Sequence, residues 1–477
     1  MQPTERFYID GEWVTPVGER RLDVVNPATE KPIATVAMGE IEDLNRAVGA
    51  ARKSFESFCR TTREDRMALL RSIVDVYKRR MKDLSATLTS EMGAPVSLAD
   101  GAQVPAGLNH FVCALEELKG FAFEEDVGSA RVIREPIGVC GLITPWNWPL
   151  NQIGAKMAAV IATGCVAVLK PSEVAPLTGL VMAEIMDEAG VPPGVFNVIN
   201  GEGPTLGVAM SSHPDIDMIS FTGSTRAGVS VAENSAATVK RVTQELGGKS
   251  PNIILEDADF EQVIPRDFAG MCMNSGQTCN AATRMLVPES RAAEAVAIAK
   301  MAAESTKVGD PLDRDTEIGP LVSSAQLDKV RALIERGIQE GAQLVTGGVD
   351  TPAGLSSGYY VKPTVFSRVT NDMTIAREEI FGPVLSIITY KDEAEAVRIA
   401  NDTVYGLAAY VSSADPERAK RVGKQLRAGN VHLNGARVNP EAPFGGYKQS
   451  GNGREFSRWG MQDFLEIKAL LGFNPSS

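Results

Sequence analysis

Between Gly138 and Gln244 the chain alternates short apolar runs with helix-like segments, and this alternation constrains the fold more than any other feature. The apolar runs are expected to be buried strands; they are 139–144, 166–170, 196–199, 218–221 and 239–244. The intervening segments are expected to be helices; they lie near 151–163, 177–190, 204–211 and 226–236. A strand–helix alternation of this kind predicts a parallel sheet covered by helices.

Polar or glycine-rich residues follow each of these five expected strands. The segments are Pro145-Trp146-Asn147-Trp148-Pro149, Lys170-Pro171-Ser172-Glu173, Asn200-Gly201-Glu202-Gly203, Thr222-Gly223-Ser224-Thr225-Arg226-Ala227-Gly228 and Glu245-Leu246-Gly247-Gly248-Lys249-Ser250. Ligands of open parallel sheets bind beyond the carboxyl ends of the strands. We therefore expect a ligand site along this one edge.

A second α/β pattern follows a boundary near 247–251. Its strands are expected at 253–255, 285–287, 384–390, 408–411 and 431–433, and its helices near 259–272, 290–305, 323–340 and 414–427. Ahead of both patterns, Asp10-Gly11 between β-prone runs predicts a hairpin, and apolar residues at three- to four-residue steps over 70–88 predict a long amphipathic helix. Two strand-like segments, 129–135 and 463–471, fit neither pattern. We expect them to pair as an outlying ribbon, whose exposed edge suggests subunit contacts.

Composition restricts the partners and the compartment. The chain has 477 residues and a net charge of −12, which argues against nucleic acid or an anionic membrane as the main partner. Its longest nearly apolar stretch, 157–169, is shorter than the roughly 20 residues of a transmembrane helix, and the amino-terminal residues do not resemble a signal peptide. Six dispersed cysteines without a CxxC pair, with only three histidines, predict no metal site and no disulfide framework. Free thiols suit the reducing cytoplasm.

Two side chains are candidates for catalysis on local sequence. Cys279 follows the polar loop 274–278, whose small side chains are expected to leave its thiol accessible to a substrate; an inert buried thiol is the alternative. Glu245 closes a buried strand, and it is either a base tuned by its surroundings or a structural carboxylate that caps a helix or pairs with Lys249.

Two further features at the same edge point to ligand binding. Lys170 ends an apolar strand, and because lysine is rarely buried alone we expect a ligand or Glu173 beside it. The glycine-rich turn 223–228 is either a phosphate contact at a helix N-terminus or an ordinary tight turn. The sequence Gly248-Lys249-Ser250 does not complete a Walker A loop, because position 243 is threonine.

Seven motifs, in order along the chain, resemble those of the NAD(P)-dependent aldehyde dehydrogenase superfamily. They are Pro145-Trp-Asn-Trp-Pro149, Lys170-Pro-Ser-Glu173, Phe221-Thr-Gly-Ser224, Glu245-Leu-Gly-Gly-Lys-Ser-Pro251, Gly276-Gln-Thr-Cys279, Glu378-Glu-Ile-Phe-Gly-Pro383 and Pro443-Phe-Gly-Gly-Tyr-Lys448. The 34 positions from Glu245 to Cys279 match the usual spacing of that family, and the resemblance covers essentially the whole chain.

The resemblance implies a reaction and a set of catalytic residues. Cys279 would attack the aldehyde carbonyl, Asn147 and the backbone N–H of Cys279 would stabilise the oxyanion, and Glu245 would activate the water that hydrolyses the thioester. Lys170 would complete the catalytic set. The product would be a carboxylate, with NAD as the expected cofactor and NADP less favoured.

The resemblance also implies the cofactor site and the domains. The expected cofactor contacts are Thr144, Trp146, Lys170, Ser172, Glu173, Gly203, Gly223, Ser224, Leu246, Glu379 and Phe381. Residues 1–120 and 137–247 would form a Rossmann-like NAD-binding domain, 248–448 a catalytic α/β domain, and 121–136 with 449–477 a small β ribbon for assembly into a homodimer or homotetramer.

Two alternatives and one departure from the family pattern stay open at this level. A CoA-acylating aldehyde dehydrogenase is disfavoured, since that branch usually lacks the glutamate at the position of Glu245. A non-catalytic structural protein on the same scaffold is disfavoured because the cysteine, the glutamate and the asparagine are all present. Gln152 and Ala155 stand where relatives acting on small or aromatic aldehydes often have bulky side chains, which suggests a wider substrate tunnel.

Overall fold

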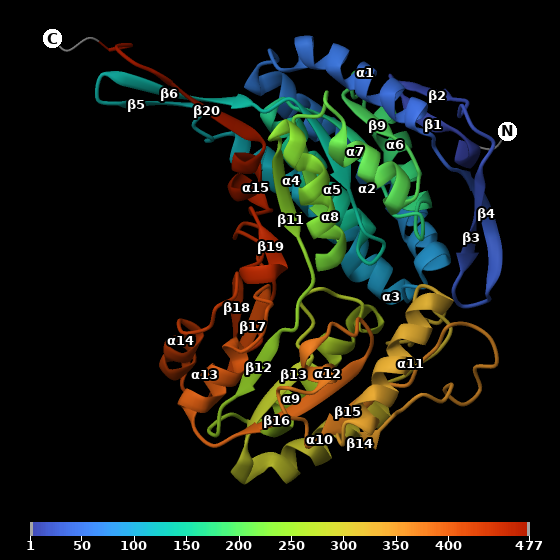
Figure 1. Ribbon diagram of the computed structural model, residues 1–477, viewed down its shortest axis with the longest axis vertical. Coiled ribbons are helices and arrows are strands. Elements are labelled where there is room, and N and C mark those ends of the chain that lie inside the picture. Colours follow the sequence, from blue (N-terminus) through green and yellow to red (C-terminus); the bar gives the residue numbers. More distant parts are fainter. Residues whose placement is uncertain (1–2, 475–477) are drawn as a thin grey trace.

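The alternation that begins at Gly138 folds into the parallel centre of an eight-stranded sheet (Figure 1). The computed structural model describes residues 3–474. The sheet order is β19-β11-β10-β7-β8-β9-β1-β2, and its five parallel strands are β7 (Val139–Ile143), β8 (Val166–Lys170), β9 (Phe196–Val198), β10 (Met218–Thr222) and β11 (Arg241–Glu245). The predicted Asp10-Gly11 hairpin, β1 (Phe7–Ile9) and β2 (Glu12–Val14), extends one edge antiparallel, and β19 (Gly451–Asn452) closes the other.

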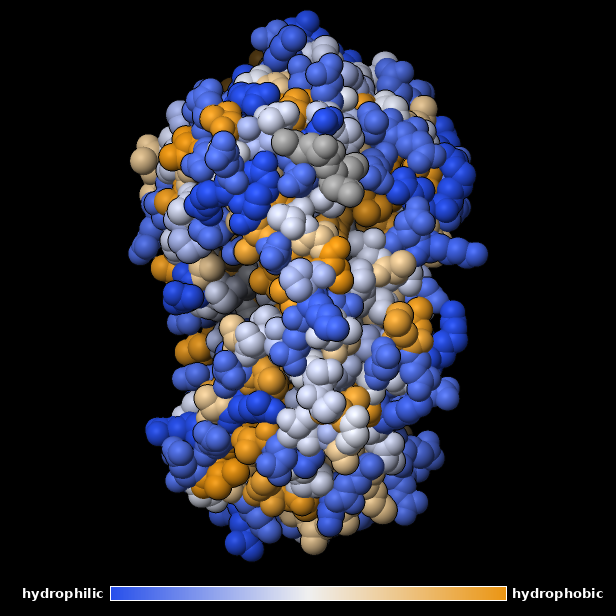
Figure 2. All heavy atoms as spheres, turned by 90° about the vertical axis from the view of Figure 1, so that its right-hand side faces the viewer, coloured by the Kyte–Doolittle hydropathy of each residue, from blue (hydrophilic) through white to orange (hydrophobic). Residues whose placement is uncertain are grey.

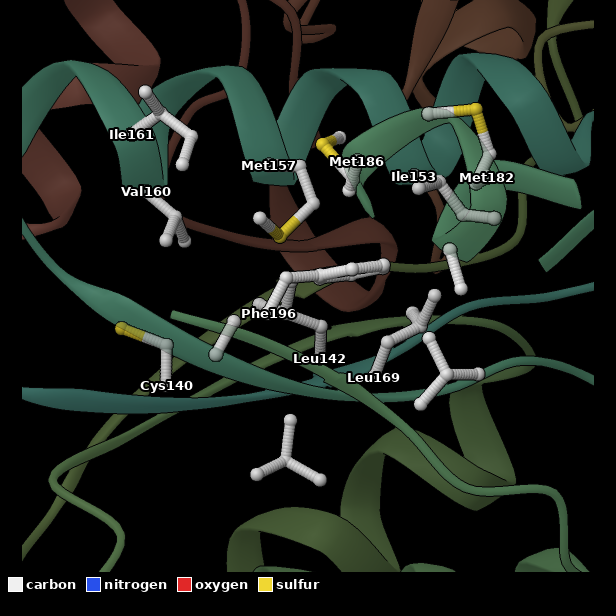
Figure 3. Packing of buried hydrophobic residues seen from close by; sticks show 14 of the residues in the cluster. Cys140, Leu142, Ile153, Met157, Val160, Ile161, Leu169, Met182, Met186 and Phe196 are labelled. Atoms are coloured by element: carbon white, nitrogen blue, oxygen red, sulfur yellow. The ribbon is translucent and has the colours of Figure 1, made fainter. Parts of the chain in front are cut away.

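Helices cover both faces of this sheet. They include α1 (Ile41–Phe58), α2 (Arg63–Met92), α4 (Val104–Leu118), α5 (Pro149–Thr163), α6 (Leu177–Glu188), α7 (Val208–Ser212) and α8 (Thr225–Ser235). Figure 3 shows side chains of α5 and α6, among them Met157 and Met186, packed over Phe196 and Leu169 of the strands. β7, β8, β9 and β10 are buried along their whole length and carry one charged residue, Lys170, which explains why they are recognisable as apolar runs. β11 is partly exposed and carries Arg241 and Glu245.

A seven-stranded sheet forms the second part of the molecule, below the first in Figure 1. Its order is β14 (Gln343–Thr346), β15 (Thr364–Ser367), β16 (Val384–Tyr390), β13 (Arg284–Pro288), β12 (Pro251–Ile254), β17 (Ala408–Ser412) and β18 (Asn430–Leu433), and all pairs except β14 with β15 are parallel. Its helices include α9 (Phe260–Cys272), α10 (Ala292–Ser305), α11 (Ser324–Gln339), α13 (Glu393–Asn401) and α14 (Pro416–Gly423).

The two orphan segments pair as predicted and project from the molecule as a ribbon (Figure 1). β20 (Leu465–Leu470) lies antiparallel to β6 (Ala130–Pro136), which also pairs with β5 (Glu124–Val127). The α/β fold with two sheets and a small ribbon, predicted from the sequence, is confirmed. Residues 1–2 and 475–477, at the ends of the expected first and last segments, lie outside the described residues.

Several element boundaries differ from the prediction for local reasons. The segment 463–471 starts as the end of α15 (Ser457–Asp463), and β11 begins only at Arg241 because Val239 is exposed with a left-handed φ of 55°. The helix expected at 204–211 is a π-helical turn, Gly203–Gly207, followed by α7. The helix expected at 414–427 ends at Gly423.

Figure 2 shows one face on which polar residues predominate and hydrophobic residues occur in small groups. Within residues 3–474, no helix is both long enough and apolar enough to span a bilayer.

Candidate active site

A pocket of about 200 Å³ lies where the carboxyl ends of the strands of the first sheet face loops of the second sheet. Nine of the predicted site residues line it: Trp146, Asn147, Gly223, Ser224, Glu245, Leu246, Cys279, Glu379 and Phe381. Lys170, Ser172, Glu173, Gly203 and Thr144 are not part of this lining. The structure therefore brings together the three principal catalytic candidates, although two come from strand ends of the first sheet and Cys279 comes from the loop after α9.

The loop before Cys279 has an unusual backbone. After α9 ends, Asn274, Ser275 and Gly276 all adopt left-handed φ values of 56°, 59° and 74°. At Gly276 a Cβ would lie 2.2 Å from the carbonyl of Gly382, so only glycine fits there. This turn directs the following residues, including Cys279, into the pocket.

The Cys279 side chain is half-buried rather than freely accessible. It packs against an apolar cluster of Ala155, Leu407, Phe444 and Phe456. Burial raises the pKa of its thiol, and the nearby carboxylates of Glu379 and Glu245 raise it further. The thiol nevertheless lines the pocket, so its accessibility to a substrate stays a prediction.

Asn147 is fixed by the nucleophile loop. Its Nδ2 donates to the carbonyl of Gln277 at 3.0 Å, and its own carbonyl accepts from Nδ2 of Asn274 at 2.8 Å. One amide hydrogen of Asn147 is thereby anchored, while the other has no protein acceptor among the described residues and is available to a ligand in the pocket.

Glu245 ends β11 with both carboxylate oxygens buried and without a hydrogen-bond partner in the described chain. Burial raises its pKa well above the usual range, and the neighbouring charge of Glu455 adds to this shift, while Lys156 opposes it. Lys156 lies 2.5 Å from Glu455 in a buried ion pair. The alternative in which Glu245 pairs with Lys249 is not realised, because Lys249 Nζ is buried without a partner as well.

A second pocket of about 380 Å³ adjoins the other end of the same sheet edge, and Gly203, Phe221 and Arg226 are among its lining residues. Thr222, Gly223 and Ser224 line the first pocket, so the turn from β10 to α8 belongs to both. Ser224 caps α8, its Oγ accepting from the amide of Ala227 at 3.3 Å. The two pockets together form an elongated region along the strand ends.

Lys170 has the partners that its burial demands. Its Nζ donates to the carbonyls of Gly201 at 2.7 Å and Pro171 at 3.0 Å, and lies 3.2 Å from Glu173. Burial lowers the pKa of Lys170, and Glu173 opposes that shift. Ser172 accepts from the amide of Val174 at 3.2 Å and thus shapes this turn.

Other predicted contacts lie around the first pocket. Glu379 Oε1 accepts from the amide of Gly248 at 2.9 Å. Trp146 meets Phe381 edge-on, with ring centroids 5.4 Å apart. Thr144 Oγ1 is buried at the end of β7 without a partner in the described residues, as expected of a group that awaits a ligand or water.

Sequence reasoning missed several residues of the site. Gln326 and Lys329, on α11, line the first pocket, and Gln326 Nε2 donates to the carbonyl of Phe381 at 2.8 Å. Lys156 and Glu455 set the electrostatics around Glu245. The sequence does hold a signal for Lys156: it lies inside the apolar helix 149–163, and a lysine buried there requires a partner of opposite charge or a hydrogen-bond acceptor.

Comparison with known proteins gives a uniform result. The model of the aldehyde dehydrogenase family matches residues 13–470. The chain belongs to the aldehyde dehydrogenase family. It is 53% identical to a 3-succinoylsemialdehyde-pyridine dehydrogenase of Pseudomonas sp over 477 residues, covering 100% of both chains.

Solved aldehyde dehydrogenases have the same fold. A mutant of aldehyde dehydrogenase C from Pseudomonas syringae, crystallised with NAD+ and octanal, is 51% identical, with a TM-score of 0.99 over 100% of this chain and 98% of that one. Betaine aldehyde dehydrogenase from Staphylococcus aureus with NAD+ is 37% identical, with a TM-score of 0.96 over 99% and 96% of the two chains. These relationships confirm the family, the fold class and the assignment as an oxidoreductase acting on aldehydes.

Proposed function

We propose that this aldehyde dehydrogenase oxidises its substrate through covalent catalysis by Cys279. The observation that carries the proposal is the convergence of Cys279, Asn147 and Glu245 on one pocket. The Cys279 thiolate adds to the aldehyde carbon, and the carbonyl π electrons move to oxygen, giving a tetrahedral adduct. The free amide hydrogen of Asn147 and the backbone N–H of Cys279 stabilise the negative oxygen.

Glu245 serves as the base for hydrolysis. Once the adduct has lost hydride and become a thioester, Glu245 takes a proton from water, whose oxygen attacks the thioester carbon. The C–S bond breaks, the carboxylic acid leaves, and the sulfur regains a proton. The partner-free oxygens and raised pKa of Glu245 suit a group that accepts a proton during turnover and is not held in a structural salt bridge.

The residues along the sheet edge fit NAD. We assign the adenosine ribose to Lys170 and Glu173, the pyrophosphate to Gly223 and Ser224, and the nicotinamide ribose to Glu379. Thr144, Trp146, Ser172, Gly203, Leu246 and Phe381 complete the site. NAD, when bound, accepts the hydride that the adduct releases. Glu173 favours NAD over NADP, because a 2′-phosphate would meet its negative charge.

These roles assign functions to the parts of the fold. We propose that residues 1–120 and 137–247 bind NAD and that 248–448 carry the nucleophile. The ribbon segments 121–136 and 449–477 would mediate a homodimer or homotetramer, since Ile467 and Leu471 are 72% and 85% exposed on it. Sedimentation of the protein tests this assembly. Six free thiols support a cytoplasmic location.

The substrate we propose is a neutral, largely apolar aldehyde. The rings of Phe444 and Phe456 stack 5.0 Å apart beside Cys279, with Ala155 and Leu407 in the same apolar cluster. This apolar cluster beside the nucleophile favours alkyl or aryl groups and has no charged partner for an ionic substituent. The relative crystallised with octanal and the pyridine semialdehyde dehydrogenase give further support.

NADH formation tests the proposal. With NAD, octanal and 3-pyridinecarboxaldehyde should give higher kcat/KM than succinic semialdehyde or betaine aldehyde, which carry charges. The product should be the free acid whether or not CoA is added. Acyl-CoA formation would contradict the hydrolytic role of Glu245, and preference for the charged aldehydes would contradict the substrate class.

A further inference from the structure

A buried amide network lies behind the proposed oxyanion site and reaches it from the first part of the molecule. Gln103 is the last residue of a π-helical turn, Ala99–Gln103, directly before α4. Its side chain is fully buried, and its Nε2 donates to Oδ1 of Asn274 at 3.1 Å and lies 3.5 Å from the carbonyl of Asn147. A π turn inserts an extra residue into a helix and is frequent at functional sites.

Asn274 is the centre of this network. Its Nδ2 donates both to the carbonyl of Asn147 at 2.8 Å and to that of Gln277 at 3.2 Å. The carbonyl of Gln277 also accepts from Nδ2 of Asn147. Both hydrogens of the Asn274 amide are therefore used on the two backbone groups that hold the oxyanion donor.

This arrangement requires one orientation of the Asn274 amide. If the amide flipped, its oxygen would face two carbonyl oxygens, and all three are acceptors. Gln103 Nε2 prevents the flip, because it offers a donor to the side where the Asn274 oxygen lies. The backbone at Asn274 and Ser275 is left-handed, a conformation that costs of order 1–3 kcal/mol for each non-glycine residue and persists only where the surroundings enforce it.

We propose that Gln103 is a positioning residue for the oxidation of the aldehyde: by fixing the amide of Asn274 it holds the Asn147 donor in the geometry that stabilises the oxyanion. Gln103 itself does not line the pocket and touches no reacting atom. The inference rests on the proposed role of Asn147 as oxyanion donor.

A double-mutant cycle between Gln103 and Asn147 tests this role. Asn147→Ala should lower kcat about 10²–10³-fold, the usual effect of losing one oxyanion donor. Gln103→Leu should lower kcat about 10–100-fold, because small misplacements of catalytic groups have effects of this size. In the Asn147→Ala background, Gln103→Leu should change kcat less than about twofold, since groups that act through one another are not additive.

Two further measurements separate positioning from general damage to the fold. The Kd for NAD, measured by fluorescence quenching, and the pH dependence of Cys279 alkylation by iodoacetamide should match wild type in Gln103→Leu. Ser85→Ala is the matched control: Ser85 donates to Asp100 at 2.6 Å in the same π turn without contacting Asn274 or Asn147. Its kcat should stay within twofold of wild type.

If Gln103→Leu does not fold, Gln103→Glu provides the test. A buried carboxyl has a raised pKa, and only its protonated form can donate to Asn274. The ratio of mutant to wild-type kcat should therefore rise as the pH falls from 8 to 6. The positioning role would be overturned if this kcat ratio did not change with pH. It would also be overturned if the Gln103 substitution lowered kcat by the same factor in the wild-type and Asn147→Ala backgrounds. Full activity of Asn147→Ala would instead refute the oxyanion assignment in the proposed function.

Discussion

Replacing Glu245 by Gln should stop the reaction after the first half-turnover. The substitution keeps the size of the side chain and removes its basicity, at a position where both oxygens are buried and lack partners. Acylation depends on Cys279 and the oxyanion donors, whereas deacylation depends on Glu245. The perturbation therefore separates two steps that occur in one pocket.

The expected magnitude follows from general-base catalysis, which contributes about 10²–10⁴-fold. Steady-state kcat should fall by that factor. The substitution should not lower the stability of the folded state. Because the pKa of Glu245 is raised in the folded state, its stabilising contribution is present at low pH and is lost as the pH rises through the folded pKa. An uncharged amide avoids that loss, so Glu245→Gln should be at least as stable as wild type at pH 8.

Rapid mixing with octanal and NAD is the assay. The mutant should release about one equivalent of NADH per active site in a burst and then turn over slowly, with a thioester on Cys279 visible by mass spectrometry. In wild type, log kcat limited by deacylation should rise with pH as Glu245 ionises, and the mutant should lack this rise. If Glu245 also deprotonates Cys279, the burst is smaller near pH 7 and recovers at higher pH, where thiols ionise unaided.

Glu455→Gln supplies the matched control. It removes the negative charge that raises the pKa of Glu245 and leaves Lys156 as an unpaired cation nearby, and both changes lower that pKa. The acid limb of the pH profile should move to lower pH while hydrolysis persists. Normal turnover of Glu245→Gln, or acceleration of the wild type by CoA with formation of acyl-CoA, would refute the assignment of Glu245 as the hydrolytic base.

Three other outcomes test separate parts of the reasoning. Cys279→Ser should abolish NADH formation while the Kd for NAD, measured by calorimetry, stays near wild type. NAD should exceed NADP in kcat/KM by at least about tenfold, or ~1.4 kcal/mol, and Glu173→Gln should narrow that gap. Burial lowers the pKa of Lys249 to about 7, so between pH 7 and 10 the unfolded chain binds a proton that the folded chain lacks. The free energy of unfolding of wild type, relative to that of Lys249→Met, should therefore rise with pH by up to about 1.4 kcal/mol per pH unit. Urea unfolding at several pH values measures this difference.

The sequence predicts the parallel centre of the fold, the edge hairpin and the outlying ribbon, but not every short or half-exposed element. Four of the five parallel strands, β7 to β10, are recognisable because burial on both faces makes them short apolar runs, whereas β11 is partly exposed and more polar. Short or half-exposed elements give weaker signals, as shown by β3 (Arg21–Asn26) and β4 (Lys31–Ala37), which no pattern indicated. The π turn at Ala99–Gln103 could not be foreseen either, since one inserted residue leaves the helical periodicity almost unchanged.

Some residues of the candidate site could likewise be predicted from the sequence, and others could not. Residues that directly follow a strand, such as Asn147 and Glu245, could be predicted because topology brings strand ends to one edge. Gln326 and Lys329 lie on a helix, where a polar residue facing the pocket has the same sequence pattern as one facing solvent. Gln103 is buried by contacts with residues more than 40 positions away, which only the folded chain reveals.

Gly247 and Gly248, which follow Glu245, matter both for the boundary between the two sheets and for the candidate site. A Cβ on Gly247 would lie 2.5 Å from the carboxylate of Glu379, and one on Gly248 would lie 2.5 Å from the carbonyl of Cys279. The link between the two sheets therefore packs directly against the proposed nucleophile and the proposed ribose ligand. At Gly248 the close atom belongs to the backbone of Cys279, so a side chain there would require the nucleophile loop to move, whereas at Gly247 the Glu379 side chain would have to move. The glycine pair that marks the domain boundary in the sequence therefore also serves the site, because the proposed base, nucleophile and cofactor carboxylate meet in one pocket where the backbone carries no side chain at these two positions.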